Sequence, residues 1–203
     1  MGHLRHPVMC ILATLLCAAV ATARLPYVYT DWQHFTVKDG LPNDHIFAVE
    51  AAGDNIWVGT EDGLARIDKR TSKIDSWQEK DGLPWRVVSA LDMNPKTGEL
   101  WLGLFGGGLA RFSGGRFDHW HQLNSGLVND VVYGVAVEHD NVWAATTAGA
   151  SRYNTVTGEW TIYTEKNAPM EEIWNYGCSY NDGKMYLGVW GSGVLEFDIA
   201  TET

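Results

Sequence analysis

Residues 39–68 read DGLPNDHIFAVEAAGDNIWVGTEDGLARID, and this stretch decides the fold. It alternates turn-forming and strand-forming segments. An Asp-Gly-Leu-Pro turn leads to an apolar run, a Gly-Asp-Asn turn leads to the strand-like segment 56–60, and a last glycine turn precedes 63–68. Short runs of β-branched and aromatic residues bounded by Gly, Pro, Asn and Asp are typical of strands joined by tight turns.

The same order of turns and strands recurs three more times along the chain. The units open at Trp32, Trp77, Trp120 and Trp160, which are spaced 45, 43 and 40 residues apart. Two further series keep the same register: the aromatic residues Trp57, Trp101, Trp143 and Tyr186, and the glycines Gly63, Gly108, Gly149 and Gly193. No stretch shows sustained helical periodicity, so we expect few helices.

Three short strands and one Trp-led strand per unit give four antiparallel strands in about 43 residues, which is the size of a β-propeller blade. We therefore predict an all-β fold, a β-propeller with about four repeats present, that is, a partial or small propeller. The units are expected near 32–76, 77–119, 120–159 and 160–203. The Trp57 series is expected to pack between blades rather than to contact a ligand. The strand at Trp32 is a candidate for completing the last blade by ring closure.

The N-terminus has the pattern of an export signal. Arg5 gives a basic start, residues 8–20 are a nearly unbroken apolar run, and Ala21-Thr22-Ala23 fits a cleavage site. We predict a signal peptide at 1–23, an exported protein that is periplasmic or extracellular, and a propeller over 24–203. The alternative is an uncleaved anchor.

The net charge limits the kinds of binding partner, and the cysteine content limits the possible disulfides. The net charge is −10, and removal of 1–23 takes away only Arg5, which leaves −11. An acidic chain repels phosphate backbones, so we expect no nucleic acid, and contact with a membrane only through a segment outside this chain. Cys178 is then the single cysteine, which excludes an internal disulfide and favours a buried, unreactive thiol.

The repeat resembles the two-component regulator propeller repeat. The residues that carry the likeness are Asp39-Gly40-Leu41-Pro42, Trp57-Val58-Gly59-Thr60 and 63–68, and it extends over 31–200. Unit three departs from the pattern with Ala144-Ala145-Thr146, and unit four loses the Gly-Leu turn. The resemblance implies an extracytoplasmic sensor in which several such repeats form a large propeller. It also implies a downstream kinase domain, which is not in this chain.

Candidate binding residues come from loops at equivalent positions in the four units. The sequence contains no catalytic string and no cysteine pair at metal spacing, so we expect no catalytic residue, no metal site and no cofactor. The loops at one face of a propeller instead combine aromatic rings with carboxylates, amides and one arginine, which suits sugar stacking and hydrogen bonding to hydroxyl groups. These candidates are Asn43, Asp44, His45, Trp85, Arg86, Phe105, Asn129, Asp130, Glu171, Glu172 and Trp190.

Three functions remain open from the sequence. The first is an extracytoplasmic binding or sensing propeller for a carbohydrate or polar small molecule. The second is an exported propeller enzyme, a polysaccharide or lactone lyase, for which a carboxylate pair such as Asp44 and Asp130 is a possible acid–base pair. The third is a protein-interaction module. Unpaired blade edges also predict self-association.

Overall fold

A computed structural model describes residues 32–203, so the predicted signal peptide at 1–23 lies outside the described residues. In this part the chain forms fifteen strands and two short 3-10 turns, η1 (Val37–Asp39) and η2 (Glu79–Asp81). Within residues 32–203, neither helical turn has the length or apolar character needed to cross a membrane. Residues Phe35–Thr203 form one compact unit.

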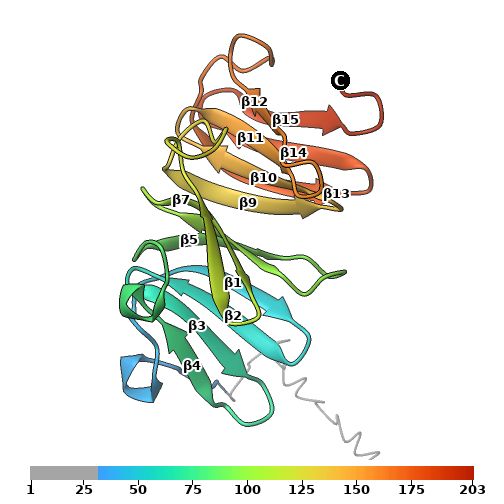
Figure 1. The fold of residues 1–203 in the computed structure, drawn as a ribbon. Coiled ribbons are helices and arrows are strands. Elements are labelled where there is room, and N and C mark those ends of the chain that lie inside the picture. Colours follow the sequence, from blue (N-terminus) through green and yellow to red (C-terminus); the bar gives the residue numbers. More distant parts are fainter. Residues whose placement is uncertain (1–31) are drawn as a thin grey trace, which may run out of the picture. The chain divides into compact units, whose positions relative to one another are not determined.

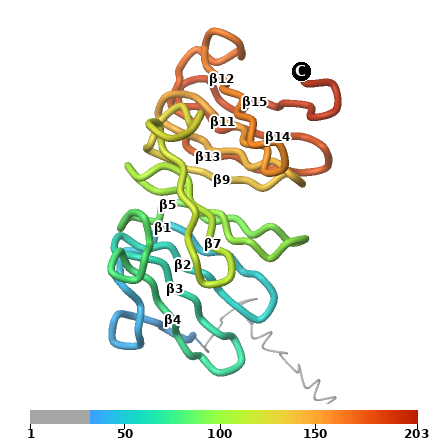
Figure 2. Tube along the Cα trace, in the orientation of Figure 1, coloured from blue at the N-terminus to red at the C-terminus, as the bar shows by residue number. Residues whose placement is uncertain are grey.

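The strands form four antiparallel sheets, and within each sheet every strand pairs with the next one along the chain. Figures 1 and 2 show the chain passing from one sheet to the next in sequence order. The first sheet is β1 (Ile46–Ala52), β2 (Asn55–Thr60), β3 (Gly63–Asp68) and β4 (Ile74–Trp77). The second is β5 (Val88–Met93), β6 (Leu100–Leu104), β7 (Gly108–Ser113) and β8 (Arg116–Trp120). The third is β9 (Val132–Glu138), β10 (Asn141–Thr146), β11 (Gly149–Asn154) and β12 (Trp160–Tyr163), and the fourth is β13 (Asn175–Asn181), β14 (Lys184–Val189) and β15 (Gly193–Asp198).

The prediction of an all-β fold made of four-stranded blades is confirmed for three sheets, and the fourth sheet has three strands. Residues 32–36 contain no strand. The strand expected at Trp32 is therefore not formed, and β15 is the outer strand of the fourth sheet.

The strand register corrects the alignment of the Trp-led strands. Leu64 pairs with Trp77 and Leu109 pairs with Trp120, but their counterpart Ala150 pairs with Tyr163, not with Trp160. Tyr163 also stacks on its own sheet's Trp143, as Trp77 stacks on Trp57. The 40-residue spacing to Trp160 was the sign of this shift, because Tyr163 restores the 43-residue interval that separates Trp77 and Trp120.

Each sheet packs on the next through large aromatic residues, as predicted for the Trp57 series. We call the side of a sheet that meets the following sheet its trailing face, and the opposite side its leading face. Trp101 and Trp143 are fully buried on the trailing faces of the second and third sheets. Trp101 contacts Trp120 of its own sheet and Tyr153 of the next, at centroid distances of 5.2 and 6.1 Å.

The Asp-Gly-Leu-Pro turn has a packing role. Its leucine is buried in each of the first three units, and Met170 takes the same place in the divergent fourth turn. Leu83 belongs to the cluster between the first and second sheets, and Leu127 to the next cluster. The turn therefore anchors each connection between sheets by inserting one apolar side chain.

The inner strands approach each other closely at small residues. Strands β1, β5, β9 and β13 contact one another in that order. A Cβ placed on Gly59 would lie 2.6 Å from the carbonyl oxygen of Val88, and one on Gly103 would lie 2.8 Å from the Val132 side chain. Glycine at these two positions therefore sets how near consecutive sheets can come.

We predict that Trp101→Ala lowers the free energy of unfolding by roughly 3–5 kcal/mol, because it leaves a cavity between two sheets. Chemical denaturation measures the change. Leu123→Ala, at a position that is 93% exposed, is the control and should have little effect. Equal stability of the two variants would contradict this account of the core.

One half-buried carboxylate ties two sheets together. Asp92 on β5 accepts a hydrogen bond of 2.6 Å from the backbone N–H of Val137 on β9. Burial raises the pKa of Asp92 above its usual value, and burial together with the nearby Asp92 charge raises the pKa of Glu50. The folded protein therefore favours the protonated form of Asp92.

A raised folded-state pKa predicts a definite pH dependence. The contribution of Asp92 to stability is fully present below its unfolded-state pKa and is lost as the pH rises through the folded-state pKa. As the pH rises above the usual carboxyl pKa, the native protein should lose stability relative to Asp92→Asn, whose amide oxygen can still accept from the backbone N–H of Val137. Denaturation at several pH values checks this, and parallel curves for the two proteins would argue against it.

Candidate functional site

A β-bulge at the start of every inner strand places one side chain at the same end of the sheets. In the register of β1 with β2, Ile46 pairs with Thr60 and Ala48 with Gly59, so Phe47 has no partner. The equivalent unpaired residues in the other sheets are Ser89, Tyr133 and Tyr176. Bulges redirect side chains in this way at many binding sites. We call this end, with its hairpin turns and connecting loops, the loop face.

Four rings form a continuous row across the loop face, and we call them the aromatic row: Phe105, Tyr133, Tyr176 and Trp190. Successive ring centroids lie 5.4, 4.7 and 5.6 Å apart. Phe105 and Tyr176 are each 42% exposed and Trp190 is 64% exposed. Two members come from hairpin turns and two from bulges, so the row extends over the second, third and fourth sheets.

Trp85 supports one end of the row rather than extending it. Its indole N–H donates to the carbonyl oxygen of Phe105 at 2.8 Å. A Cβ on Gly107 would lie 2.3 Å from the Trp85 side chain, so the tryptophan packs directly on the glycine turn that carries Phe105. Trp85 is 40% exposed and therefore has both a structural contact and a free surface.

A polar cluster lies at the loop face of the first sheet. The Nδ1 of His45 is 2.6 Å from a carboxylate oxygen of Glu61. Arg86 donates to the backbone carbonyl of Glu61 and lies 3.5 Å from the carboxylate of Asp62. The structure therefore brings the predicted residues His45 and Arg86 together on Glu61, with His45 at its carboxylate and Arg86 at its backbone carbonyl.

Asp44 and Asp130 close their own connecting loops. Asp44 accepts a hydrogen bond from the backbone N–H of Val37, and Asp130 accepts one from Gln122, at 2.8 and 2.7 Å. The neighbouring amides have similar local roles. Asn43 accepts from the N–H of His45, and Asn129 accepts from the N–H of Val131 and from Thr147. These four predicted residues hold loop conformations in units one and three.

Glu171 and Glu172 place two exposed carboxylates beside the Trp190 turn. The backbone N–H groups of both residues donate to the hydroxyl of Ser192, at 2.9 and 3.2 Å. Their side chains take no part in these bonds, and a Cβ on Gly191 would lie 3.4 Å from the side chain of Glu172. The fourth-sheet end of the row is therefore acidic.

Sequence reasoning missed Tyr133 and Tyr176 because it compared loops and left the inner strands aside. A signal was present, since the residue after each bulge is small in all four units: Ala48, Ala90, Gly134 and Gly177. Each of these pairs across the strand with another small residue, for example Ala48 with Gly59. A small pair repeated in every unit marks the close approach, and the residue before it is the one that turns outward.

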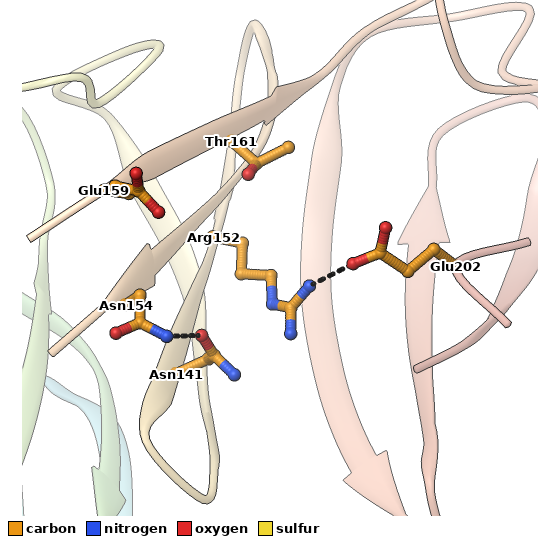
Figure 3. Close-up of a pocket in the computed structure, with 6 residues that line it drawn as sticks. All are labelled: Asn141, Arg152, Asn154, Glu159, Thr161 and Glu202. Carbon is orange, nitrogen blue, oxygen red and sulfur yellow. Dashed lines mark hydrogen bonds and ion pairs between the residues drawn. The ribbon is translucent and has the colours of Figure 1, made fainter. Parts of the chain in front are cut away.

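A pocket of about 230 Å³ lies among the residues around Arg152, away from the aromatic row. Figure 3 shows Arg152 directed toward Glu202, with Asn141 bonded to Asn154. Arg152 lies 3.5 Å from the buried Glu138 and 3.6 Å from Glu202, and its guanidinium covers the Trp143 ring. Two carboxylates already neutralise the charge of Arg152, so the residues of this pocket form a structural ion-pair cluster. The pair of Arg66 with Asp75 is its counterpart in the first sheet.

We predict that Trp85→Phe loosens the Phe105 turn. The change removes the donor to the Phe105 carbonyl and keeps a ring on the glycine turn, so the free energy of unfolding should fall by about 1 kcal/mol. Hydrogen exchange at the turn amides should accelerate. The matched control is Trp190→Phe, because the Trp190 indole N–H donates to no carbonyl in residues 32–203. Equal exchange rates in the two variants would contradict the support role of Trp85.

The comparisons with known proteins concern the fold. No family model and no curated protein matches the chain. Among solved structures, the extracellular domain assigned to the hybrid two component system BT4673 of B. thetaiotaomicron has a TM-score of 0.64 and 20% identity. That match covers 80% of this chain and 22% of the other. The chain therefore spans about a fifth of that domain.

Other similar structures come from unrelated settings. The computationally designed Ika4 protein has a TM-score of 0.59 and 14% identity, with 76% of this chain and 91% of that chain covered. The Cps50 (Swd1) beta-propeller domain of Myceliophteria thermophila has a TM-score of 0.54 and 16% identity, with 74% and 52% covered. At these identities the likeness shows the fold alone. The four sheets are blades of a β-propeller.

Proposed function

We propose that the chain is a ligand-binding β-propeller that works outside the cytoplasm and binds a carbohydrate along the aromatic row. The observation that carries this proposal is the continuous contact of four partly exposed rings across three sheets. Sugar rings present apolar C–H faces, and exposed aromatic rings are the side chains that stack on them. A row suits an extended chain of sugar units better than a single small ring.

The charges around the row favour a neutral glycan. Glu171 and Glu172 are exposed at one end of the row, and the whole chain carries a net charge of −10. An anionic sugar such as a uronate would meet like charge there, which costs binding free energy. Carboxylates and Arg86 can instead hydrogen-bond to neutral hydroxyl groups.

We further propose that binding is reported to a partner domain outside this chain, as the resemblance to the two-component regulator repeat implies. The likeness to the BT4673 domain, which is described as extracellular, and the predicted signal peptide support export. A ligand that bridges Phe105, Tyr133 and Trp190 contacts three sheets at once. It would therefore favour one relative placement of those sheets, and a population shift of this kind can be transmitted.

The alternatives are an exported lyase and a protein-interaction propeller. Incubation with neutral oligosaccharides and with polyuronates distinguishes the lyase from the proposed binding protein. Product formation from either substrate would overturn the binding-only function. Asp44 and Asp130 are occupied by backbone amides of their own loops, which weighs against an acid–base role for them. The protein-interaction alternative predicts no saturable binding of either glycan.

We predict that Trp190→Ala and Tyr176→Ala each weaken binding of neutral oligosaccharides by roughly 10–100-fold, the usual cost of removing an aromatic anchor. Isothermal titration calorimetry measures the affinity. Their melting temperatures should stay close to that of the native protein, because Trp190 and Tyr176 are 64% and 42% exposed.

Phe47→Ala is the matched control for these two variants. Phe47 occupies the same bulge position in the first sheet and is 55% exposed, but Ser89 separates it from the row. Its substitution should leave the affinity unchanged. If Phe47→Ala loses as much affinity as Tyr176→Ala, the ligand does not follow the aromatic row.

A further inference from the structure

Trp174 is an exposed tryptophan at the loop face that the aromatic row does not include. It is 49% exposed and comes directly before β13. Its carbonyl oxygen accepts a hydrogen bond of 2.8 Å from the backbone N–H of Trp190. Within residues 32–203, its indole takes part in no hydrogen bond and no ring contact. The packing of the chain therefore leaves an aromatic surface free next to the end of the row.

The same backbone hydrogen bond joins equivalent residues in the other three sheets. The pairs are Glu61 with His45, Phe105 with Val87, and Thr147 with Val131. In the first sheet the two side chains touch, since the Nδ1 of His45 lies 2.6 Å from the carboxylate of Glu61. Side chains at these two positions are therefore neighbours on the loop face. Among the four sheets of residues 32–203, the fourth is the one with an aromatic ring at both positions.

The segment that carries Trp174 is held in place by its backbone. The N–H groups of Glu171 and Glu172 both donate to the hydroxyl of Ser192, at 2.9 and 3.2 Å. Asn175, the residue after Trp174, is fully buried. The backbone of this segment is therefore set before a ligand arrives, which lowers the entropy cost of binding.

Two carboxylates next to these rings have no positively charged partner. Glu171 and Glu172 are exposed, and in the part of the chain that the structure describes neither forms an ion pair. A Cβ on Gly191, the residue after Trp190, would lie 3.4 Å from the side chain of Glu172. Aromatic rings attract a cation through their negative faces, and carboxylates attract it through their charge. Both kinds of group therefore favour the same class of ligand.

We call Glu171, Glu172, Trp174, Tyr176 and Trp190 the fourth-sheet subsite. The Tyr176 and Trp190 rings lie 5.6 Å apart at an interplanar angle of 54°, so their faces are inclined to each other. We propose that this subsite binds a sugar unit that carries a protonated amine, at one end of the glycan that lies along the aromatic row. This inference rests on the proposed function and adds the chemistry of one end of the ligand.

A protonated amine matches each group of the subsite. It is attracted to the face of a tryptophan ring, and it has three N–H donors for carboxylates that can only accept. A neutral sugar makes the stacking contact without the charge attraction, and a uronate is repelled. Phe105 and Tyr133, in the rest of the row, are uncharged, so the remainder of the glycan can be neutral.

The test compares two oligosaccharides of equal length, a tetramer of glucosamine and a tetramer of N-acetylglucosamine. Isothermal titration calorimetry on the full chain should show about 10-fold tighter binding of the glucosamine tetramer. This preference should shrink as the salt concentration rises, because the two carboxylates are exposed. It should vanish at a pH high enough to deprotonate the amine, while the affinity for the N-acetylated tetramer stays nearly constant.

Two sets of variants locate the preference. Glu171→Gln with Glu172→Gln should abolish the preference for the amine and keep the affinity for the N-acetylated tetramer. Trp174→Leu keeps apolar bulk without a ring and should weaken binding of the glucosamine tetramer by about 3-fold or more, whereas Trp174→Phe should retain part of the preference. All three positions are exposed, so the variants should remain folded.

Asp54→Asn with Glu159→Gln is the matched control for the double variant. It removes two exposed carboxylates in the turns between β1 and β2 and between β11 and β12, at the opposite end of the sheets from the loop face. The net charge of the control equals that of the Glu171 and Glu172 variant. The preference for the amine should persist in it.

Equal affinity for the two tetramers would overturn the inference. A preference that survives the double variant of Glu171 and Glu172, or one that is lost equally in the control, would overturn it as well. In each of these cases the N-acetylated tetramer still binds along the row, and the proposed function stands. If neither tetramer binds, the inference is wrong, and calorimetry with other neutral oligosaccharides decides the proposed function separately.

Discussion

The structure depends on how closely neighbouring sheets approach at their inner strands. The backbone carbonyl oxygen of Val88 lies only 2.6 Å from the point where a Cβ on Gly59 of the preceding sheet would be. The sheets diverge from there toward their outer strands, where the stacked pairs Trp57 with Trp77 and Trp101 with Trp120 fill the wider gap. Small residues inside and large aromatic rings outside are two consequences of one geometry, because protein interiors are packed without large voids.

The same close approach creates the candidate site. The bulge that precedes each small pair leaves one residue out of the ladder and turns it toward the loop face. The residue at this position differs from unit to unit, as Phe47, Ser89, Tyr133 and Tyr176. Because this residue differs between units while the strands keep the same arrangement, a single asymmetric site can be built on a pseudo-symmetric scaffold.

The close approach recurs between successive sheets. Val88 and Val132 are fully buried where they meet Gly59 and Gly103 of the preceding sheets. A polar contact bridges the same inner strands, since the half-buried Asp92 of the second sheet accepts a hydrogen bond from the backbone N–H of Val137 in the third.

The sequence by itself determined the repeat, the strand content and the order of turns, because turn chemistry and the spacing of aromatic residues are local signals. It also identified Trp85, Phe105 and Trp190 as aromatic loop residues. Only the tertiary structure decided that Trp85 supports Phe105, that Tyr133 and Tyr176 join the row, and that Tyr163 takes the place expected for Trp160. These depend on strand register and on contacts between sheets, which join residues far apart in the sequence and are not fixed by local turn chemistry.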